Sequence, residues 1–403
     1  MRPKSIFAFF TIFLLTPLLG GCWDSMDIEK RATVLAIAID KVDPSEKKEE
    51  SYISHFPGSL PRDGEMLQLT AQVSVPGRIP LGPETTGGGE QEPVWVLTAV
   101  GHTVDDALLN LQQELADQLF LGHLRVLVIS KEIAQEGVKE INDYFRRNAQ
   151  VRRTTWMVIS EEKAAKYMKI APKLERVPAL YLTDMVSNAE QLGKLPSADM
   201  GIFWRTLSSK GQDGALPYLK IHKEENIAIK GFAYFYEDKM KGIIEPIEIG
   251  NLMSVLGEKE GGYGAFYTVP GSDDKVLVRA IRRYSRMKTS IKNGKPEIRV
   301  KIRYETEIDE DAKNKVNLGS VKLIKKIEKR ASKDITTSLK RLIQKMQKEE
   351  SDIFGFGEHV RAKQPAYWNK HVKTKEKWRQ VFKDIDIEIE MDVQIQQSGI
   401  KAK

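Results

Sequence analysis

Cysteine is almost absent from this sequence: Cys22 is the single one in 403 residues. No intramolecular disulfide can form, so the fold must be stabilised by hydrophobic cores large enough to need no cross-links. Long apolar runs are also missing after the N-terminal segment. Because a membrane-spanning helix needs roughly 20 apolar residues, we expect the rest of the chain to be water-soluble.

Recognisable catalytic and metal-binding patterns are missing too. No two of the six histidines have the i, i+4 spacing of a metal-binding helix, and no Gly-x-Ser-x-Gly elbow occurs. The sequence therefore predicts a protein that is not an enzyme and that binds neither a metal nor a cofactor. An envelope enzyme remains the alternative, and it would show clustered carboxylates or histidines with perturbed pKa values in one pocket.

The charge of the chain is mildly basic. Its formal net charge is +7, with 41% hydrophobic and 30% charged residues, as in a soluble globular protein. Two groups of basic residues allow either attraction to anionic lipid headgroups or simple solvation of an exposed face: Arg146, Arg147, Arg152 and Arg153, and Arg279, Arg282, Arg283, Arg286 and Lys288. Nucleic acid is not expected as a partner, since stacking aromatics do not interleave with these groups.

The N-terminus resembles a lipoprotein signal. Arg2 and Lys4 precede an apolar run from Ile6 to Leu19, which is too short to span a bilayer. The run ends in Leu19-Gly20-Gly21-Cys22, with small residues before a cysteine whose thiol can carry a diacylglycerol. We therefore predict a signal peptide over residues 1–21 and lipidation at Cys22. A cleaved signal followed by an accidental cysteine is the alternative.

Residues 22–205 are predicted to form one or more α/β domains, because apolar strand patterns alternate with helical ones. We expect strands at residues 34–39, 67–73, 94–98, 124–129 and 154–159, and helices from Thr103 and over residues 133–147, 161–169 and 179–192. Residues 76–93 contain Gly87-Gly88-Gly89 but no P-loop ending, so we interpret them as a loop.

Residues 206–225 are predicted to be a linker, with an exposed turn at residues 208–213. Residues 226–403 are predicted to form a C-terminal α+β domain. We expect one-face-buried strands at residues 297–304 and 385–395 and an amphipathic helix whose apolar stripe runs from Val321 to Met346. The expected fold class is thus α+β and multidomain, with mixed sheets packed against helices and a long amphipathic helix in the C-terminal domain. That stripe packs on the neighbouring sheet or, as the alternative, enters a partner groove.

Two local features need an interpretation. The run from Asp352 to Gly357 contains two glycines and two phenylalanines, which indicates a packed structural turn, with Trp368 and Trp378 pinning the helix that follows. His123 lies at a helix-to-strand junction, where it is either a structural histidine or a ligand contact.

Several short motifs, in their order and spacing, resemble the Ger(x)C family, the lipoprotein C subunits of spore germinant receptors. The matching residues run from the signal to near the C-terminus: Leu19 to Asp24, Ile37-Ala38-Ile39-Asp40, Gly101 with Thr103, Gly122-His123, Gly231 to Phe235, and Asp352 to Gly357 followed by Trp368 and Trp378. Ala38 departs from the glycine usual in this family, and residues 76–93 cannot be mapped onto it.

The resemblance implies a non-enzymatic receptor subunit of three extracytoplasmic domains, anchored through acylated Cys22 on the outer face of the spore inner membrane. Its implied partners are a multi-spanning A subunit, a B subunit similar to amino-acid permeases, and membrane lipid. The family provides no catalytic residues to carry over. A solute-binding lipoprotein that delivers a small molecule to a transporter is the alternative function, and a deep interdomain cleft would distinguish it.

Overall fold

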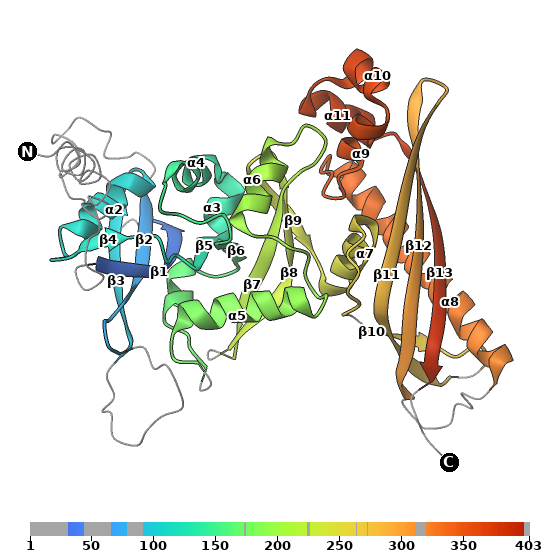
Figure 1. The fold of residues 1–403 in the computed structure, drawn as a ribbon, viewed down its shortest axis with the longest axis horizontal. Coiled ribbons are helices and arrows are strands. Elements are labelled where there is room, and N and C mark those ends of the chain that lie inside the picture. Colours follow the sequence, from blue (N-terminus) through green and yellow to red (C-terminus); the bar gives the residue numbers. More distant parts are fainter. Residues whose placement is uncertain are drawn as a thin grey trace, which may run out of the picture.

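The computed structural model describes residues 31–43, 66–78, 92–172, 175–223, 226–262, 264–271, 273–311 and 320–398. The predicted signal peptide and Cys22 lie outside these ranges, as do residues 79–91 of the predicted loop. The described chain forms two sheets with helices against them (Figure 1), so the predicted α+β class with mixed sheets is confirmed.

The first sheet has nine strands and a parallel centre. Its order is β3-β2-β1-β5-β6-β7-β8-β9, with β4 paired to β1. β1, β5, β6 and β7 run parallel, whereas the remaining neighbours on the main path pair antiparallel. The strands are β1 (Arg31–Lys41), β2 (Leu67–Ser74), β3 (Val94–Gly101), β4 (Gln118–Phe120), β5 (Val126–Ser130), β6 (Trp156–Ser160), β7 (Ala215–His222), β8 (Asn226–Tyr236) and β9 (Lys239–Ile244).

β5 and β6 are apolar except for their final serines because helices cover both faces of the sheet. Every residue of β5 and β6 is buried, and successive side chains enter opposite cores: Val128 packs on one side and Ile129 on the other. α5 (Pro178–Gln191) and the 3-10 helix Ala164–Met168 cover the first side. The second is covered by α2 (Val104–Gln112), α3 (Lys131–Glu136), α4 (Lys139–Arg147) and α6 (Met200–Ser208).

Two helices predicted for this region differ in the structure. The single helix expected over residues 133–147 is split into α3 and α4 at Gly137, which has a φ of +142°. A Cβ on Gly137 would lie 2.6 Å from an Asp238 carboxylate oxygen, so the break is fixed by the β8–β9 turn. The helix expected over residues 161–169 is a short 3-10 helix, whose first amides donate to the Asp40 carboxylate.

The predicted linker, residues 206–225, contains the end of α6 and all of β7. β7 pairs with β6 on one side and β8 on the other, so β8 and β9 complete the nine-stranded sheet although they lie beyond residue 225. Pro217 lies in β7, yet pairing with β6 involves only Tyr218 and Leu219. The proline, which has no N–H, therefore lies beyond the end of that ladder.

The second sheet has the order β10-β11-β12-β13. Its strands are β10 (Gly264–Thr268), β11 (Lys275–Lys292), β12 (Lys295–Asp311) and β13 (Asp386–Ser398), and they include both strands predicted here. β12 and β13 are parallel, which requires a crossover connection. α8 (Val321–Lys348) begins this crossover and packs along β13 (Figure 1).

The apolar stripe of α8 faces the second sheet, as predicted. Ile327, Ala331, Leu339, Leu342 and Met346 are fully buried, whereas Val321 is 74% exposed. The crossover continues through α9 (Phe356–Lys363), α10 (Pro365–Tyr367), a π-helical turn (Trp368–Val372) and α11 (Lys375–Phe382). α7 (Pro246–Leu256) lies between the two sheets and contacts β8, β11 and α8.

Candidate functional site at a buried polar junction

The turn after α8 is organised around one buried carboxylate. Asp352 is completely buried, and its two oxygens accept hydrogen bonds from the amides of Gly355, Phe356 and Gly357, at 2.9, 3.2 and 2.8 Å. The indole Nε1 of Trp378 donates a fourth bond at 3.0 Å. The predicted packed turn is thus confirmed, and its first residue, to which the sequence analysis gave no role of its own, holds it together.

The glycines of this turn are required by space and by backbone conformation. Gly355 has a φ of +74°, in the left-handed region that side chains rarely adopt. A Cβ on Gly357 would lie 2.4 Å from Nε1 of Trp378 and 2.6 Å from the Cα of Gly211. The turn is therefore pressed against the α6–β7 connection as well as against α11.

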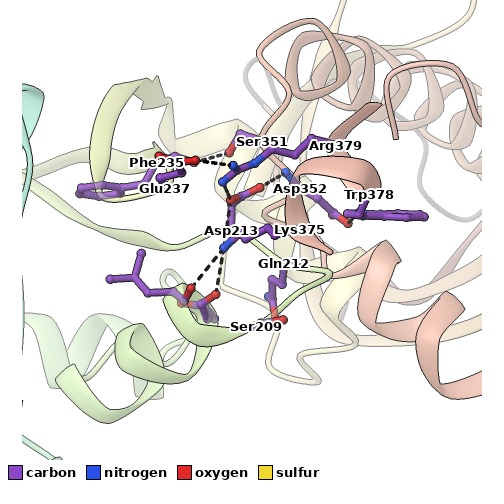
Figure 2. A network of polar contacts seen from close by, with 12 residues as sticks. Ser209, Gln212, Asp213, Phe235, Glu237, Ser351, Asp352, Lys375, Trp378 and Arg379 are labelled. Carbon is purple, nitrogen blue, oxygen red and sulfur yellow. Dashed lines mark hydrogen bonds and ion pairs between the residues drawn. The ribbon is translucent and has the colours of Figure 1, made fainter. Parts of the chain in front are cut away.

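Three charged side chains meet the turn from other elements. Arg379 Nη2 donates to Asp213 Oδ1 at 2.6 Å, and Lys375 Nζ lies 3.2 Å from the same oxygen. Asp213 Oδ2 accepts from the Asp352 amide at 3.0 Å, and the Asp213 amide donates to the Asp352 carbonyl at 2.9 Å. Figure 2 shows Arg379 and Lys375 converging on Asp213. We call Asp213, Asp352, Lys375 and Arg379 the polar junction.

The polar junction links both sheets. Arg379 also reaches Glu237 Oε1 at 3.2 Å, and its guanidinium lies 4.0 Å from the centre of the Tyr236 ring at the end of β8. Ser351 Oγ donates to the Phe235 carbonyl at 2.7 Å (Figure 2). The crossover of the second sheet is thereby bound to the C-terminal end of β8 and to the loop before β7.

The predicted exposed turn at residues 208–213 is wrong. Asp213 is 2% exposed, and the Gly211 amide donates to Glu358 Oε1 at 2.9 Å while its carbonyl accepts from the Glu358 amide. Ser209 Oγ donates to the same carboxylate oxygen. The polar composition of this segment is typical of a solvated turn, but here it provides partners for a second polar segment.

Burial dominates the electrostatics of the polar junction. It raises the pKa of Asp352 to about 7, against the four N–H donors that favour the ionised form, and nearby Asp213 adds repulsion. Burial also lowers the pKa of Lys375, although the attraction of Asp213 opposes this. The charged side chains of the polar junction bind one another, so the arrangement fits a structural connection between elements. Within the described ranges, no three His, Cys, Asp or Glu side chains gather to hold a metal ion.

Most of the other residues singled out in the sequence cap a helix, allow close backbone packing or pack in the core. Thr103 caps α2 by accepting from the Asp106 amide, and a Cβ on Gly101 would lie 2.5 Å from the Ala107 amide nitrogen. Gly231 lies in β8, where a Cβ would lie 2.4 Å from the Ile244 carbonyl. Trp368 and Trp378 are in contact, with ring centroids 5.6 Å apart.

His123 lies on the wall of a cavity of about 210 Å³, apart from the polar junction. A larger cavity of about 860 Å³ is lined by residues of α2, α3 and α4 and by Asp238. It lies beside the first sheet rather than between the two sheets. Among the described helices, none combines the length and apolar character needed to cross a bilayer.

Two family models, both described as parts of spore germination proteins, match the two halves of the chain. A family model described as the spore germination protein N-terminal domain matches residues 24–221. A second, described as spore germination B3/GerAC like, C-terminal, matches residues 230–399. The two matches together span almost the whole chain.

Individual relatives agree with these matches. Spore germination protein KC of Bacillus subtilis (strain 168) is 23% identical over 412 residues, covering 95% of this chain and 93% of that protein. GerQC of Bacillus cereus is 27% identical over 321 residues, covering 78% and 85%. The crystal structure of the GerBC protein resembles this fold with a TM-score of 0.53 at 16% identity, covering 92% of this chain and all of that one.

Proposed function

Because this chain belongs to the spore germination family of GerAC-like proteins, we propose that it is the C subunit of a nutrient germinant receptor. The observation that carries the proposal is the succession of both family regions over residues 24–221 and 230–399. The polar junction supports it further, because its residues come from both regions. A chain built this way keeps the two regions in one fixed relation.

We further propose that Cys22 carries the lipid that holds the subunit on the membrane. The support is the N-terminal pattern Leu19-Gly20-Gly21-Cys22 after a short apolar run. Two acyl chains at about 0.8 kcal/mol per buried CH₂ hold a protein firmly on a bilayer, whereas one chain holds it only marginally. The body would then lie on the outer face of the spore inner membrane.

The proposed role is non-enzymatic, with the A and B membrane subunits as partners. Anchoring confines the body beside these subunits and raises its effective concentration, so interfaces of modest affinity suffice. The polar junction suits this role since its buried charges are directed at one another rather than at a substrate.

The proposal is tested by deleting the gene in its spore-former and complementing it with the wild-type chain or with Cys22→Ala. We expect wild-type complementation to restore germination on a nutrient panel. The Cys22→Ala chain should lose the fatty-acid label and membrane association and should restore germination weakly. Labelling with a fatty-acid analogue, membrane fractionation and loss of spore refractility measure these three outcomes.

Two results would contradict parts of the proposal separately. Unchanged germination of the deletion strain on every nutrient would remove the receptor role. Full germination with an unlabelled, soluble Cys22→Ala chain would remove the role of the anchor alone.

The solute-binding alternative keeps one specific observation in its favour. The cavity of about 860 Å³ beside α2, α3 and α4 has the size of a small-molecule site. It does not lie between the two sheets, where a binding protein that closes around its ligand would place it. Saturable binding of one nutrient to the purified chain, measured by calorimetry, would favour this alternative.

A further inference from the structure

A second, smaller cavity lies at the edge where the parallel strands β5 and β6 begin. Its volume is about 210 Å³, and its walls include His123, Arg125, Arg152, Trp156, Thr183 and Ser187. The residues come from the turns before β5 and β6, from the first position of β6 and from α5. None of the residues that line it is an aspartate or glutamate.

The cavity presents cationic and hydroxyl donors. Arg125 and Arg152 are exposed, and in the described part of the chain neither guanidinium makes a hydrogen bond or ion pair. Ser187 Oγ accepts from Nε1 of Trp156 at 3.0 Å, which leaves its own proton to donate. Partial burial lowers the pKa of His123, and Arg152, Arg125 and Arg31 lower it further, as expected for a ring in a positive field.

Guanidinium groups that flank a small polar hollow fit a phosphate. Each planar fork can donate two parallel N–H bonds to phosphate oxygens, and hydroxyl groups complete the shell. Asp199 pairs with Trp156 through a backbone bridge, but it does not line the cavity, and its Oδ1 accepts from the Ile202 amide as the cap of α6.

The position of the cavity indicates where such a phosphate would come from. The Arg31 guanidinium, at the first described residue, lies 4.6 Å from the centre of the Phe120 ring, and this ring lies 5.6 Å from that of His123. Two ring contacts thus join the start of the described chain to the wall of the cavity. Cys22 precedes Arg31 by nine residues, which span at most about 30 Å when fully extended.

We propose that this cavity binds the phosphate of an anionic phospholipid headgroup, held by Arg125 and Arg152, so that this edge of the first sheet faces the bilayer. The inference rests on the lipid anchor of the proposed function, since the anchor brings the edge within reach of the membrane. It adds an orientation of the first sheet relative to the bilayer, with the starting ends of β5 and β6 turned toward the lipid.

The test uses the chain from residue 22 onward carrying Cys22→Ala, so that no acyl chain contributes to binding. Co-sedimentation with vesicles of phosphatidylglycerol and phosphatidylcholine is compared with vesicles of phosphatidylcholine alone. We expect binding to the anionic vesicles and a roughly 30-fold loss of partitioning for Arg125→Gln/Arg152→Gln, from two cations removed at the surface.

The matched control is Arg282→Gln/Arg286→Gln, which removes two exposed charges from β11 in the other sheet. It should bind as the parent chain does, and circular dichroism checks that both variants fold. Equal losses for the two pairs, or no loss for either, would overturn the proposal. If inorganic phosphate displaces the chain from anionic vesicles more strongly than sodium chloride at the same ionic strength, the cavity binds free phosphate instead.

This outcome is separable from that of the anchor. If the chain is never acylated in cells but binds anionic vesicles through Arg125 and Arg152, the proposed orientation stands and the proposed lipid anchor is wrong. A chain that is acylated in cells, but whose Cys22→Ala form binds anionic vesicles no better than phosphatidylcholine vesicles, would keep the anchor and overturn the orientation.

Discussion

At the scale of single residues, the side chain that most shapes the candidate site is Asp352. Its carboxylate has four N–H donors and yet is withdrawn entirely from water. Burial prevails over the donors and raises its pKa from the ordinary 3.8 to about 7. The turn is therefore linked to pH in the neutral range, which is unusual for an aspartate.

This shift predicts a pH dependence of stability. Because the folded-state pKa is raised, the contribution of Asp352 is fully present below about pH 4 and is lost as pH rises through about 7. Relative to Asp352→Asn, the free energy of unfolding of the wild-type chain should fall by up to about 4 kcal/mol across this range. Urea unfolding at several pH values measures the difference.

The control is Asp184→Asn, which removes an exposed carboxylate from α5 and should keep the wild-type profile. Comparing variants cancels the opposite effect of His123 and His359, whose lowered pKa values reduce stability as pH falls below about 6.5. Parallel profiles for wild type and Asp352→Asn would mean that Asp352 stays ionised throughout.

At the scale of helices and strands, periodicity was a reliable guide wherever one face alone is buried. The apolar stripe of α8 and the alternation in β12 and β13 follow directly from sequence, because their spacing matches the period of each element. α2 was located by its capping residue Thr103, which the structure confirms.

Sequence reasoning failed where tertiary contacts decide the local structure. The break at Gly137 depends on Asp238 in a distant turn, and the burial of Gly211 depends on Glu358. Neither partner lies near in sequence, so no local pattern reveals them. The one local signal for the polar junction is Asp352 placed before two closely spaced glycines, which indicates a turn but does not reveal what its carboxylate binds.

The α8 stripe allows a matched pair of substitutions. Leu342→Ala removes a fully buried side chain facing the second sheet and should lower the free energy of unfolding by about 2–5 kcal/mol. Val321→Ala, in the same helix, removes a side chain that is 74% exposed and should change it by about 0.5 kcal/mol or less. Equal effects in urea unfolding would show that the stripe is not packed against the sheet.

At the scale of the whole molecule, the polar junction connects the crossover of the second sheet to β8 and to the loop before β7. Arg379→Gln removes the closest cation of buried Asp213 and leaves Lys375 alone to compensate it. We expect a loss of about 3 kcal/mol, because breaking a buried pair strands a charge. Small-angle scattering should show a larger radius of gyration as the crossover loosens from β8.

The matched control is Glu237→Gln, which removes the other carboxylate that Arg379 contacts. Glu237 is 55% exposed, so its pair with Arg379 should contribute about 1 kcal/mol or less. If both variants unfold alike and scatter like the parent chain, the junction does not hold the sheets together.

The way β7 and β8 share a ladder has a genetic consequence. The boundary between the two family regions falls between residues 221 and 230, in the hairpin that joins these adjacent strands. A nonsense mutation there would not yield a well-folded N-terminal fragment. Without β8, β7 would become an unpaired edge strand that is open to self-association. The phenotype of alleles truncated at this hairpin would therefore reflect misfolding of the fragment, and would not reveal the function of the missing C-terminal region.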